Sequence, residues 1–213
     1  MTREKRIYLD YAATTPVDPR VFLAMQPYFT KEFGNPGSLH GFGQQASRAV
    51  FLARREIAQA LGASYQEIIF TGSATEANNL ALRGVVRNLK SQIPALPAGR
   101  SNLTSFQPPR IIVSAIEHES VLETARDLER EGVEVIYLPV SRAGLVDLEK
   151  LKKALNKKTI LVSIMYANNE IGTIQPIFEI AEIIRNFRNR ITNFSAKGGS
   201  ASGGQLPISN YPL

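Results

Sequence analysis

Apolar residues along this chain fall into two alternating patterns, one with helical spacing and one of short continuous runs. Helical spacing is clearest over 42–61, where Gly62 is placed to end the predicted helix. Asp18 and Pro19 form a typical helix start, with an N-cap and a proline at the first position. Helices are predicted over 18–30, 42–61, 74–90, 120–131, 147–155 and 177–188. Strands are predicted over 7–9, 67–71, 110–114, 133–138 and 159–165.

The predicted strands are continuously apolar, which is typical of strands buried on both faces. Their alternation with helices predicts an α/β fold with a mostly parallel sheet and helices on both faces. Residues 91–109 are rich in Pro, Ser and Asn, and we expect a loop insertion there. Residues 191–213 form a Gly- and Ser-rich tail. The predicted domain therefore spans residues 1–190.

Composition narrows the class of protein. With 44% apolar and 21% charged residues, the 213-residue chain has enough apolar material for a core. No apolar run approaches the roughly 20 residues of a membrane helix, so we expect no membrane association. The charged start lacks the apolar stretch of a secretory signal, which favours the cytoplasm. The chain has no cysteine and two histidines, a composition that excludes thiolate chemistry within it and argues against a metal site.

The net charge of +6 is unevenly distributed. Residues 84–110 hold four basic and no acidic residues, and residues 181–213 hold four basic residues and one acidic residue. Neither segment combines basic residues with interleaved aromatics, so we expect no nucleic-acid binding.

Ligands of open α/β sheets bind beyond the carboxyl ends of the strands, and polar residues follow several predicted strands here. Residues 71–76 precede a helix whose N-terminal N–H groups, with the Thr75 hydroxyl, fit a phosphate. The same residues also fit a capping box in which Ser73 and Glu76 satisfy the helix start. The two interpretations are compatible.

Two further strand ends carry candidate residues. His118, after the strand 110–114, is suited to stack on a planar ring or to move protons near neutral pH, or to cap the next helix. Asn168 and Asn169, after the strand 159–165, fit either a polar ligand or a turn that bonds its own backbone.

The first predicted strand is followed by Tyr11–Thr15, whose small and hydroxylated residues permit close approach of a substrate or form a cap region. His40 follows a Gly- and Pro-containing segment and is interpreted as a loop histidine.

Six segments together resemble the N-terminal part of cysteine desulfurases, which are pyridoxal-phosphate enzymes of the class V aminotransferase family. They read YLDYAATTPVDPRV, FGNPGSLHGFG, IIFTGSATEANNLAL, EHESVL, GLVDLEKLKKAL and ILVSIMYANNEIGTIQPI. The resemblance covers roughly residues 6–190. It implies the large domain of a fold-type-I pyridoxal-phosphate transferase, incomplete in this chain.

The resemblance implies roles for individual residues. Ala74 and Thr75 match the residues that hold the cofactor phosphate. His118 matches the histidine that stacks on the pyridine ring and moves protons. Asn169 matches the asparagine near the cofactor and the substrate, and Ala13 and Thr14 match positions on the substrate side.

The tail departs from the family pattern. Gly198 and Ala201 fall where the family has an aspartate and a glutamine that contact the cofactor. The Schiff-base lysine motif, the nucleophilic cysteine and the small C-terminal domain have no counterpart, and the surroundings of Lys197 do not match the lysine motif. Either small frameshifts or a deletion would give this pattern.

The resemblance implies removal of sulfur from L-cysteine, giving alanine and an enzyme persulfide for iron–sulfur cluster assembly or transfer-RNA thiolation. It also implies a homodimer and a sulfur acceptor or scaffold protein as partner. We expect this chain alone to be inactive, because the lysine and the cysteine are missing. The alternatives are a non-catalytic truncated paralogue that binds a dimer partner, or another class V aminotransferase.

Overall fold

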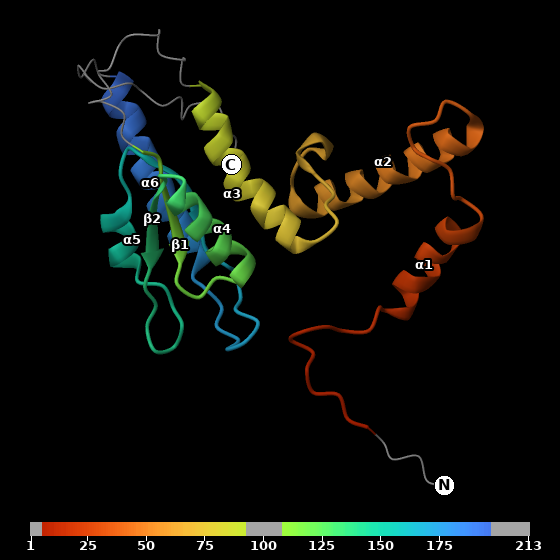
Figure 1. Cartoon of the computed structure of the whole chain (residues 1–213), viewed down its shortest axis with the longest axis horizontal. Coiled ribbons are helices and arrows are strands. Elements are labelled where there is room, and N and C mark those ends of the chain that lie inside the picture. The colour runs from red at the N-terminus through yellow and green to blue at the C-terminus, as the bar shows by residue number, and fades with distance from the viewer. Residues whose placement is uncertain (1–5, 93–107, 197–213) are drawn as a thin grey trace. The chain divides into compact units, whose positions relative to one another are not determined.

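The computed structural model describes residues 6–92 and 108–196, with side chains over 6–89 and 108–192. The chain divides into two compact units, Met1–Thr71 and Gly72–Leu213, and each is described by itself (Figure 1). The prediction of one domain over residues 1–190 stays a prediction.

The first unit contains two helices, α1 (Pro19–Thr30) and α2 (Gly41–Leu61), and one short turn of 3₁₀ helix, η1 (Tyr65–Glu67). The Asp18 side chain accepts a hydrogen bond from the Arg20 N–H at 2.8 Å, which confirms the predicted start of α1. Gly62 ends α2 with φ +66°, in the left-handed region where glycine is at no disadvantage, again as predicted.

Two predicted strands, 7–9 and 67–71, are wrong. Residues 6–10 have no regular structure, and Ile7 and Leu9 are 76% and 88% exposed. Glu67 belongs to η1, and the residues after it form no strand. A strand forms only where its backbone groups find a partner, and no strand of the described part of this unit pairs with these segments. Apolar character alone does not supply that partner.

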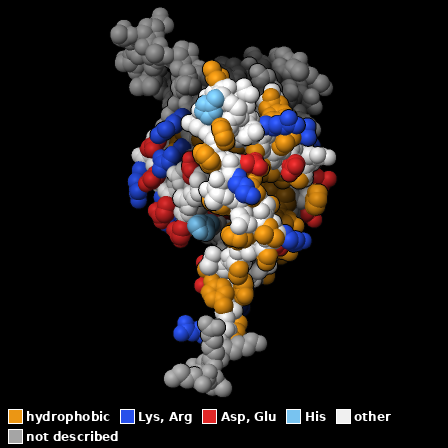
Figure 2. Space-filling view, turned by 90° about the vertical axis from the view of Figure 1, so that its right-hand side faces the viewer, with side chains coloured by type: hydrophobic (Ala, Val, Ile, Leu, Met, Phe, Trp, Pro, Cys, Tyr) orange, Lys and Arg blue, Asp and Glu red, His pale blue; other side chains and the backbone are white. Residues whose placement is uncertain are grey.

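Much of the apolar surface of the first unit is exposed. Helix α1 has no buried residue, although most of its side chains are apolar. Large side chains of α1 and of the residues just after it are more than half exposed: Phe22, Leu23, Phe29 and Phe33. The space-filling view shows many hydrophobic side chains exposed among charged and polar ones on the face that it presents (Figure 2).

The second unit is a parallel sheet with helices. Its elements in chain order are α3 (Ala74–Gln92), β1 (Arg110–Ser114), α4 (Glu119–Arg130), β2 (Glu134–Leu138), α5 (Leu148–Ala154), β3 (Thr159–Ser163) and α6 (Ile177–Ala196). The strand order is β2-β1-β3, and both pairings are parallel. Ser114 at the end of β1 pairs with Leu138, and Val113 pairs with Ser163. The carboxyl ends of all three strands therefore meet at one edge.

Helices cover both faces of this sheet, as predicted. Ile111 and Val113 of β1 pack in a cluster with residues of α3 and α4, whereas Ile112 packs in a second cluster with residues of α5 and α6. Because successive side chains of a strand point to opposite faces, the two clusters lie on opposite sides of β1. All three residues are fully buried.

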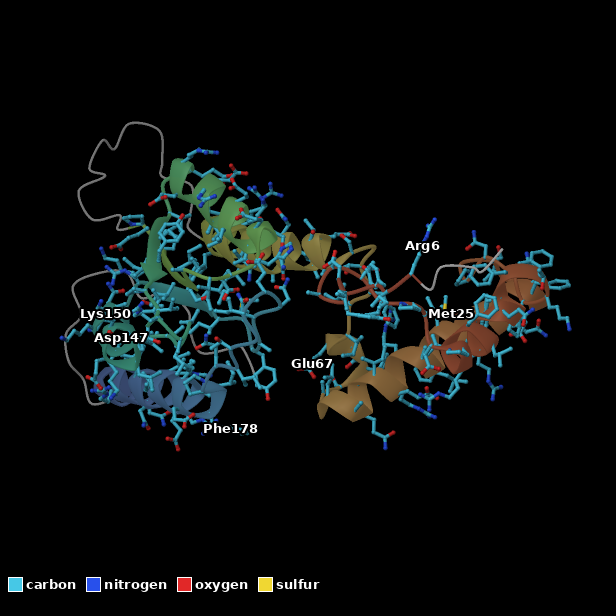
Figure 3. The ribbon with its side chains drawn as sticks, turned by 90° about the horizontal axis from the view of Figure 1, so that it is seen from below. Arg6, Met25, Glu67, Asp147, Lys150 and Phe178 are labelled. Atoms are coloured by element: carbon cyan, nitrogen blue, oxygen red, sulfur yellow. The ribbon has the colours of Figure 1, made fainter. Side chains whose placement is uncertain are left out.

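The helices are anchored by polar contacts at their ends and flanks. The Arg83 guanidinium of α3 bridges Asp127 of α4 and Glu131, the C-cap of that helix, at 2.8 Å and 3.1 Å. At the start of α5, the Asp147 carboxylate accepts a hydrogen bond from the Lys150 N–H at 3.0 Å, and both residues lie at that helix in the stick view (Figure 3).

Most element boundaries agree with the prediction to within two residues, and the ends of β3 and α6 have an evident physical reason for their difference. β3 ends at Ser163, two residues early, because the Met165 N–H donates to the Glu117 carboxylate at 2.6 Å and not to a neighbouring strand. Helix α6 continues to Ala196 rather than ending at 188, since no glycine or proline interrupts it before Gly198.

Parts of the predicted loop and tail lie outside the described residues. Helix α3 extends through Gln92 into the predicted insertion 91–109, and residues 93–107 are outside. The positions compared with cofactor-contacting residues, Gly198 and Ala201, are also outside, as is Lys197. Within the described residues, no helix has the length and apolar character needed to cross a membrane.

Candidate cofactor site

The candidate residues His118 and Asn169 follow two neighbouring strands. β1 lies directly beside β3, and the two run parallel. The turn after β1 carries His118, and the turn after β3 carries Asn169. Both turns therefore lie at the carboxyl edge of the sheet, where ligands of open α/β sheets bind.

The N-terminus of α3 is capped as one of the two interpretations predicted. The Ser73 Oγ accepts a hydrogen bond from the Glu76 N–H at 3.1 Å, and the Glu76 carboxylate accepts one from the Gly72 N–H at 2.7 Å. The first N–H groups of a helix have no acceptor inside it, so Ala74 and Thr75 present donors at this end. Both residues are exposed.

A hydrogen bond joins the N-terminal turns of α3 and α4. Asn78 Nδ2 donates to Ser120 Oγ at 2.8 Å, and the same Oγ lies 2.8 Å from Nδ1 of His118. The two helices also pack along their lengths through Leu82 and Val86 of α3. The helix start that carries Thr75 is therefore next to the helix start that carries His118.

His118 is the N-cap of α4, which confirms the capping interpretation. Its Nδ1 accepts a hydrogen bond from the Ser120 N–H at 3.1 Å. A backbone N–H can only donate, so Nδ1 is an acceptor and the neutral ring carries its hydrogen on Nε2. The residue is exposed, and both ring hydrogen bonds of the described structure use Nδ1. Capping therefore orients the ring and leaves Nε2–H for a ligand.

Glu117 is a functional candidate that the sequence reasoning missed. Glu117 is only 8% exposed. One of its carboxylate oxygens, Oε1, accepts hydrogen bonds from Ser114 Oγ and from the Met165 N–H, both at 2.6 Å. The other oxygen lies 3.4 Å from Ser163 Oγ. The sequence does offer one indication, a charged residue three positions after a strand expected to be buried. A buried carboxylate needs several hydrogen-bond donors, so such a residue is expected to contact neighbouring segments.

Asn168 and Asn169 play different parts in the turn after β3. Asn168 Oδ1 accepts from the N–H groups of Glu170 and Ile171 at 2.9 Å and 3.0 Å, so the turn interpretation is confirmed for Asn168. Its Nδ2 donates to the Ile116 carbonyl at 3.1 Å, which links this turn to the turn after β1. Asn169 is exposed at the same edge.

Ala13 and Thr14 lie in the first unit, so their place at this site stays a prediction. Both are exposed in a turn where their N–H groups donate to the Asp10 carbonyl at 3.2 Å and 3.4 Å. His40 is an N-cap and not a plain loop histidine, since its Nδ1 accepts from the Gly43 N–H at 3.4 Å. No cluster of metal-ligating side chains occurs within the part of the chain that the structure describes.

Comparison with known proteins shows the family of the chain. The family model described as aminotransferase class-V matches residues 7–193. Cysteine desulfurase IscS of Dictyoglomus turgidum is 47% identical over 184 residues, which cover 86% of this chain and 43% of that protein. The mitosomal cysteine desulfurase of Trachipleistophora hominis is 47% identical over 181 residues, covering 84% of this chain and 38% of that protein.

Solved structures give the same result. A NifS-like protein matches with a TM-score of 0.77 and 39% identity over 87% of this chain and 47% of its own. A structure titled SspA in complex with cysteine matches with a TM-score of 0.73 and 36% identity, over 85% and 48%. The chain spans about two-fifths of the length of the curated relatives that it matches. It belongs to the class-V aminotransferase family, and it is similar to the N-terminal part of cysteine desulfurases.

Proposed function

We propose that this chain is the part of a cysteine desulfurase that holds the phosphate and the ring of pyridoxal 5′-phosphate. The observation that carries the proposal is the hydrogen-bonded series Asn78–Ser120–His118, which places the α3 N-terminus beside an exposed imidazole. Its similarity to cysteine desulfurases supports L-cysteine as the substrate of the whole enzyme. One similar solved structure is named as a complex with cysteine.

The side chains at this edge fit the chemistry of the cofactor. A phosphate needs N–H and hydroxyl donors, which the first turn of α3 and Thr75 supply. The Glu76 carboxylate, the nearest like charge on that turn, is bonded back to the Gly72 N–H. A planar aromatic ring needs a flat partner, which the exposed His118 imidazole supplies. The bound cofactor would withdraw electrons from the α-carbon of the amino acid.

The residues at this edge then divide the work of binding. The N–H groups of Ala74 and Thr75 and the Thr75 hydroxyl bind phosphate. The His118 ring stacks, with its Nδ1 held by Ser120 and its Nε2–H available to move a proton. The Asn169 amide, on the neighbouring turn, orients the substrate and the phenolic oxygen of the cofactor.

Sulfur transfer needs groups beyond these. The 213 residues contain no cysteine, so no persulfide can form on this chain. In this proposal the whole enzyme is a homodimer that passes sulfur to an acceptor or scaffold protein for iron–sulfur clusters or transfer-RNA thiolation. The cytoplasm as its location stays a prediction, since one of the similar relatives is mitosomal.

Titration of the 213-residue chain with pyridoxal phosphate tests the proposal, with free cofactor measured by equilibrium dialysis. We expect saturable binding without a covalent adduct, and no sulfide release from L-cysteine. Thr75→Val and His118→Asn should each weaken binding. A chain that shows no saturable binding, or variants that bind like the parent, would contradict the proposal.

A partner-binding role without catalysis is the second candidate, and the exposed apolar side chains of α1 favour it. Large exposed apolar patches mark interaction surfaces or surfaces covered elsewhere in a larger protein. We expect the isolated chain to bind a hydrophobic dye and to self-associate in analytical ultracentrifugation. A monomer that melts cooperatively and excludes the dye would contradict this expectation and favour a small protein complete in itself.

A further inference from the structure

The turns after β1 and β3 are tied together by two side chains, each adjacent in sequence to a candidate site residue. Glu117 precedes His118, and its carboxylate reaches across to the Met165 N–H beyond the end of β3. Asn168 precedes Asn169, and its amide reaches back to the Ile116 carbonyl after β1. The two contacts run in opposite directions between the same pair of turns.

The Glu117 contact depends on the length of its side chain. Oε1 accepts from Ser114 Oγ on its own side and from the Met165 N–H on the other, both at 2.6 Å. The carboxylate therefore sits between the two strand ends. The residue is 8% exposed, so water offers little replacement for these donors.

We propose that Glu117 is a positioning residue, which sets the separation of His118 and Asn169 by bracing the ends of β1 and β3. The proposal rests on the proposed cofactor site. Glu117 does not touch the ligand in this scheme; it acts through the His118 backbone that follows it and through the turn that carries Asn169. Asn168 is the second brace of the same gap.

Two substitutions distinguish the effect of side-chain length from the effect of the charge. Glu117→Gln keeps the length of the side chain and one acceptor oxygen for Ser114 and Met165, and its amide can donate to Ser163 Oγ. Glu117→Asp keeps the charge but is one methylene shorter, so it cannot contact both strand ends. A brace therefore tolerates E117Q and fails in E117D.

A matched control is available at the opposite end of the sheet. Glu134 begins β2 and pairs with Arg110 at 2.5 Å, at the amino ends of the strands. Glu134→Gln and Glu134→Asp make the same chemical changes far along the strands from His118. These variants show the effect of lowering the stability of the sheet while the Glu117 contacts stay intact.

The first readout needs no cofactor. The chain has only two histidines, so the imidazole signals of His118 are separable by nuclear magnetic resonance, with His40→Asn for assignment. We expect E117D to shift or broaden the His118 imidazole and Asn169 amide signals together. E117Q and both Glu134 variants should leave them near the parent positions.

The second readout compares two ligands on the same proteins. We expect E117D to weaken pyridoxal phosphate binding about tenfold, the scale typical of losing a group that orients a ligating side chain. Inorganic phosphate, which needs only the α3 N-terminus, should bind with unchanged affinity. A general loss of folding would weaken both ligands, so this split distinguishes positioning from stability.

Three results would overturn the proposal: unchanged signals and affinity in E117D, equal damage in E117Q and E117D, or equal loss of cofactor affinity in E134D. If circular dichroism shows E117D to be unfolded, Asn168→Ser replaces it with the same expected outcomes. Failure of the parent chain to bind pyridoxal phosphate would sink the proposed function, while the cofactor-free signals still decide the brace.

Discussion

Asn78 of α3 donates a hydrogen bond to Ser120 of α4 across 2.8 Å, and this contact joins two residues that are 42 positions apart in the chain. We expect Asn78→Ala to lower the free energy of unfolding by about 1 kcal/mol, the net worth of a typical internal hydrogen bond. Urea unfolding followed by circular dichroism measures the change. In a double-mutant cycle with Ser120→Ala, strictly additive effects would show that the bond contributes nothing.

His118 has a capping role and a proposed ligand role, which two substitutions separate. Asparagine is among the best N-caps, so His118→Asn should keep the stability of α4 while removing the ring. His118→Ala removes both and should cost about 1 kcal/mol of unfolding free energy. Pyridoxal phosphate should bind weakly to both variants. Full affinity in His118→Asn would mean that the imidazole does not contact the cofactor.

The Thr75 hydroxyl is expected to serve the phosphate and not the fold, because the residue is exposed at the first turn of α3. Thr75→Val keeps the shape and should weaken inorganic phosphate binding by about fivefold, equivalent to roughly 1 kcal/mol for one lost hydrogen bond. Thr75→Ser is the matched control and should bind like the parent. Isothermal titration calorimetry gives both affinities, and equal values for Val and Ser would contradict the assignment.

Glu134 should make the stability of the sheet depend on acid. Its hydrogen bond from Arg110, helped by the charges of Arg110 and Lys158, lowers the pKa of the Glu134 carboxyl below its ordinary value of 4.5 despite partial burial. The lowered pKa means that this stabilisation is present above pH 4.5 and is lost as the pH falls below it. Glu134→Gln should therefore unfold with a flatter pH dependence below that value. If the free energy of unfolding fell equally with pH in parent and variant, the ion pair would not stabilise the fold.

Local rules predicted most of the helices and the central sheet. Asp18 and Gly62 mark helix ends through their own backbone and side-chain chemistry, so neighbouring sequence suffices to find them. The runs that became β1, β2 and β3 are continuously apolar, and β1 is the most deeply buried of the three. The runs at 7–9 and 67–71 have the same local character but no pairing strand in the described structure, and pairing is not a local property.

The candidate site was predictable only in part, for the same reason. His118 stands out because it follows a strand and caps a helix, and Thr75 because it lies in the first turn of a helix, although the strand predicted before it does not form. Glu117 does not, because its role depends on Met165, which is brought beside it only by the pairing of β1 with β3. A spacing rule within one segment cannot detect a carboxylate that joins two segments.

The contact from Glu117 to Met165 joins residues that are 48 positions apart, so it can form only after both have been synthesised. During synthesis, the turn that carries His118 leaves the ribosome well before the strand end that must meet it. Until β3 has emerged and docked beside β1, the Glu117 carboxylate lacks its Met165 donor, and the turn that carries His118 is not yet linked to the turn that carries Asn169. The carboxyl edge of the sheet would therefore be assembled only after β3 is complete, when this bond and the bond from Asn168 to the Ile116 carbonyl can both form.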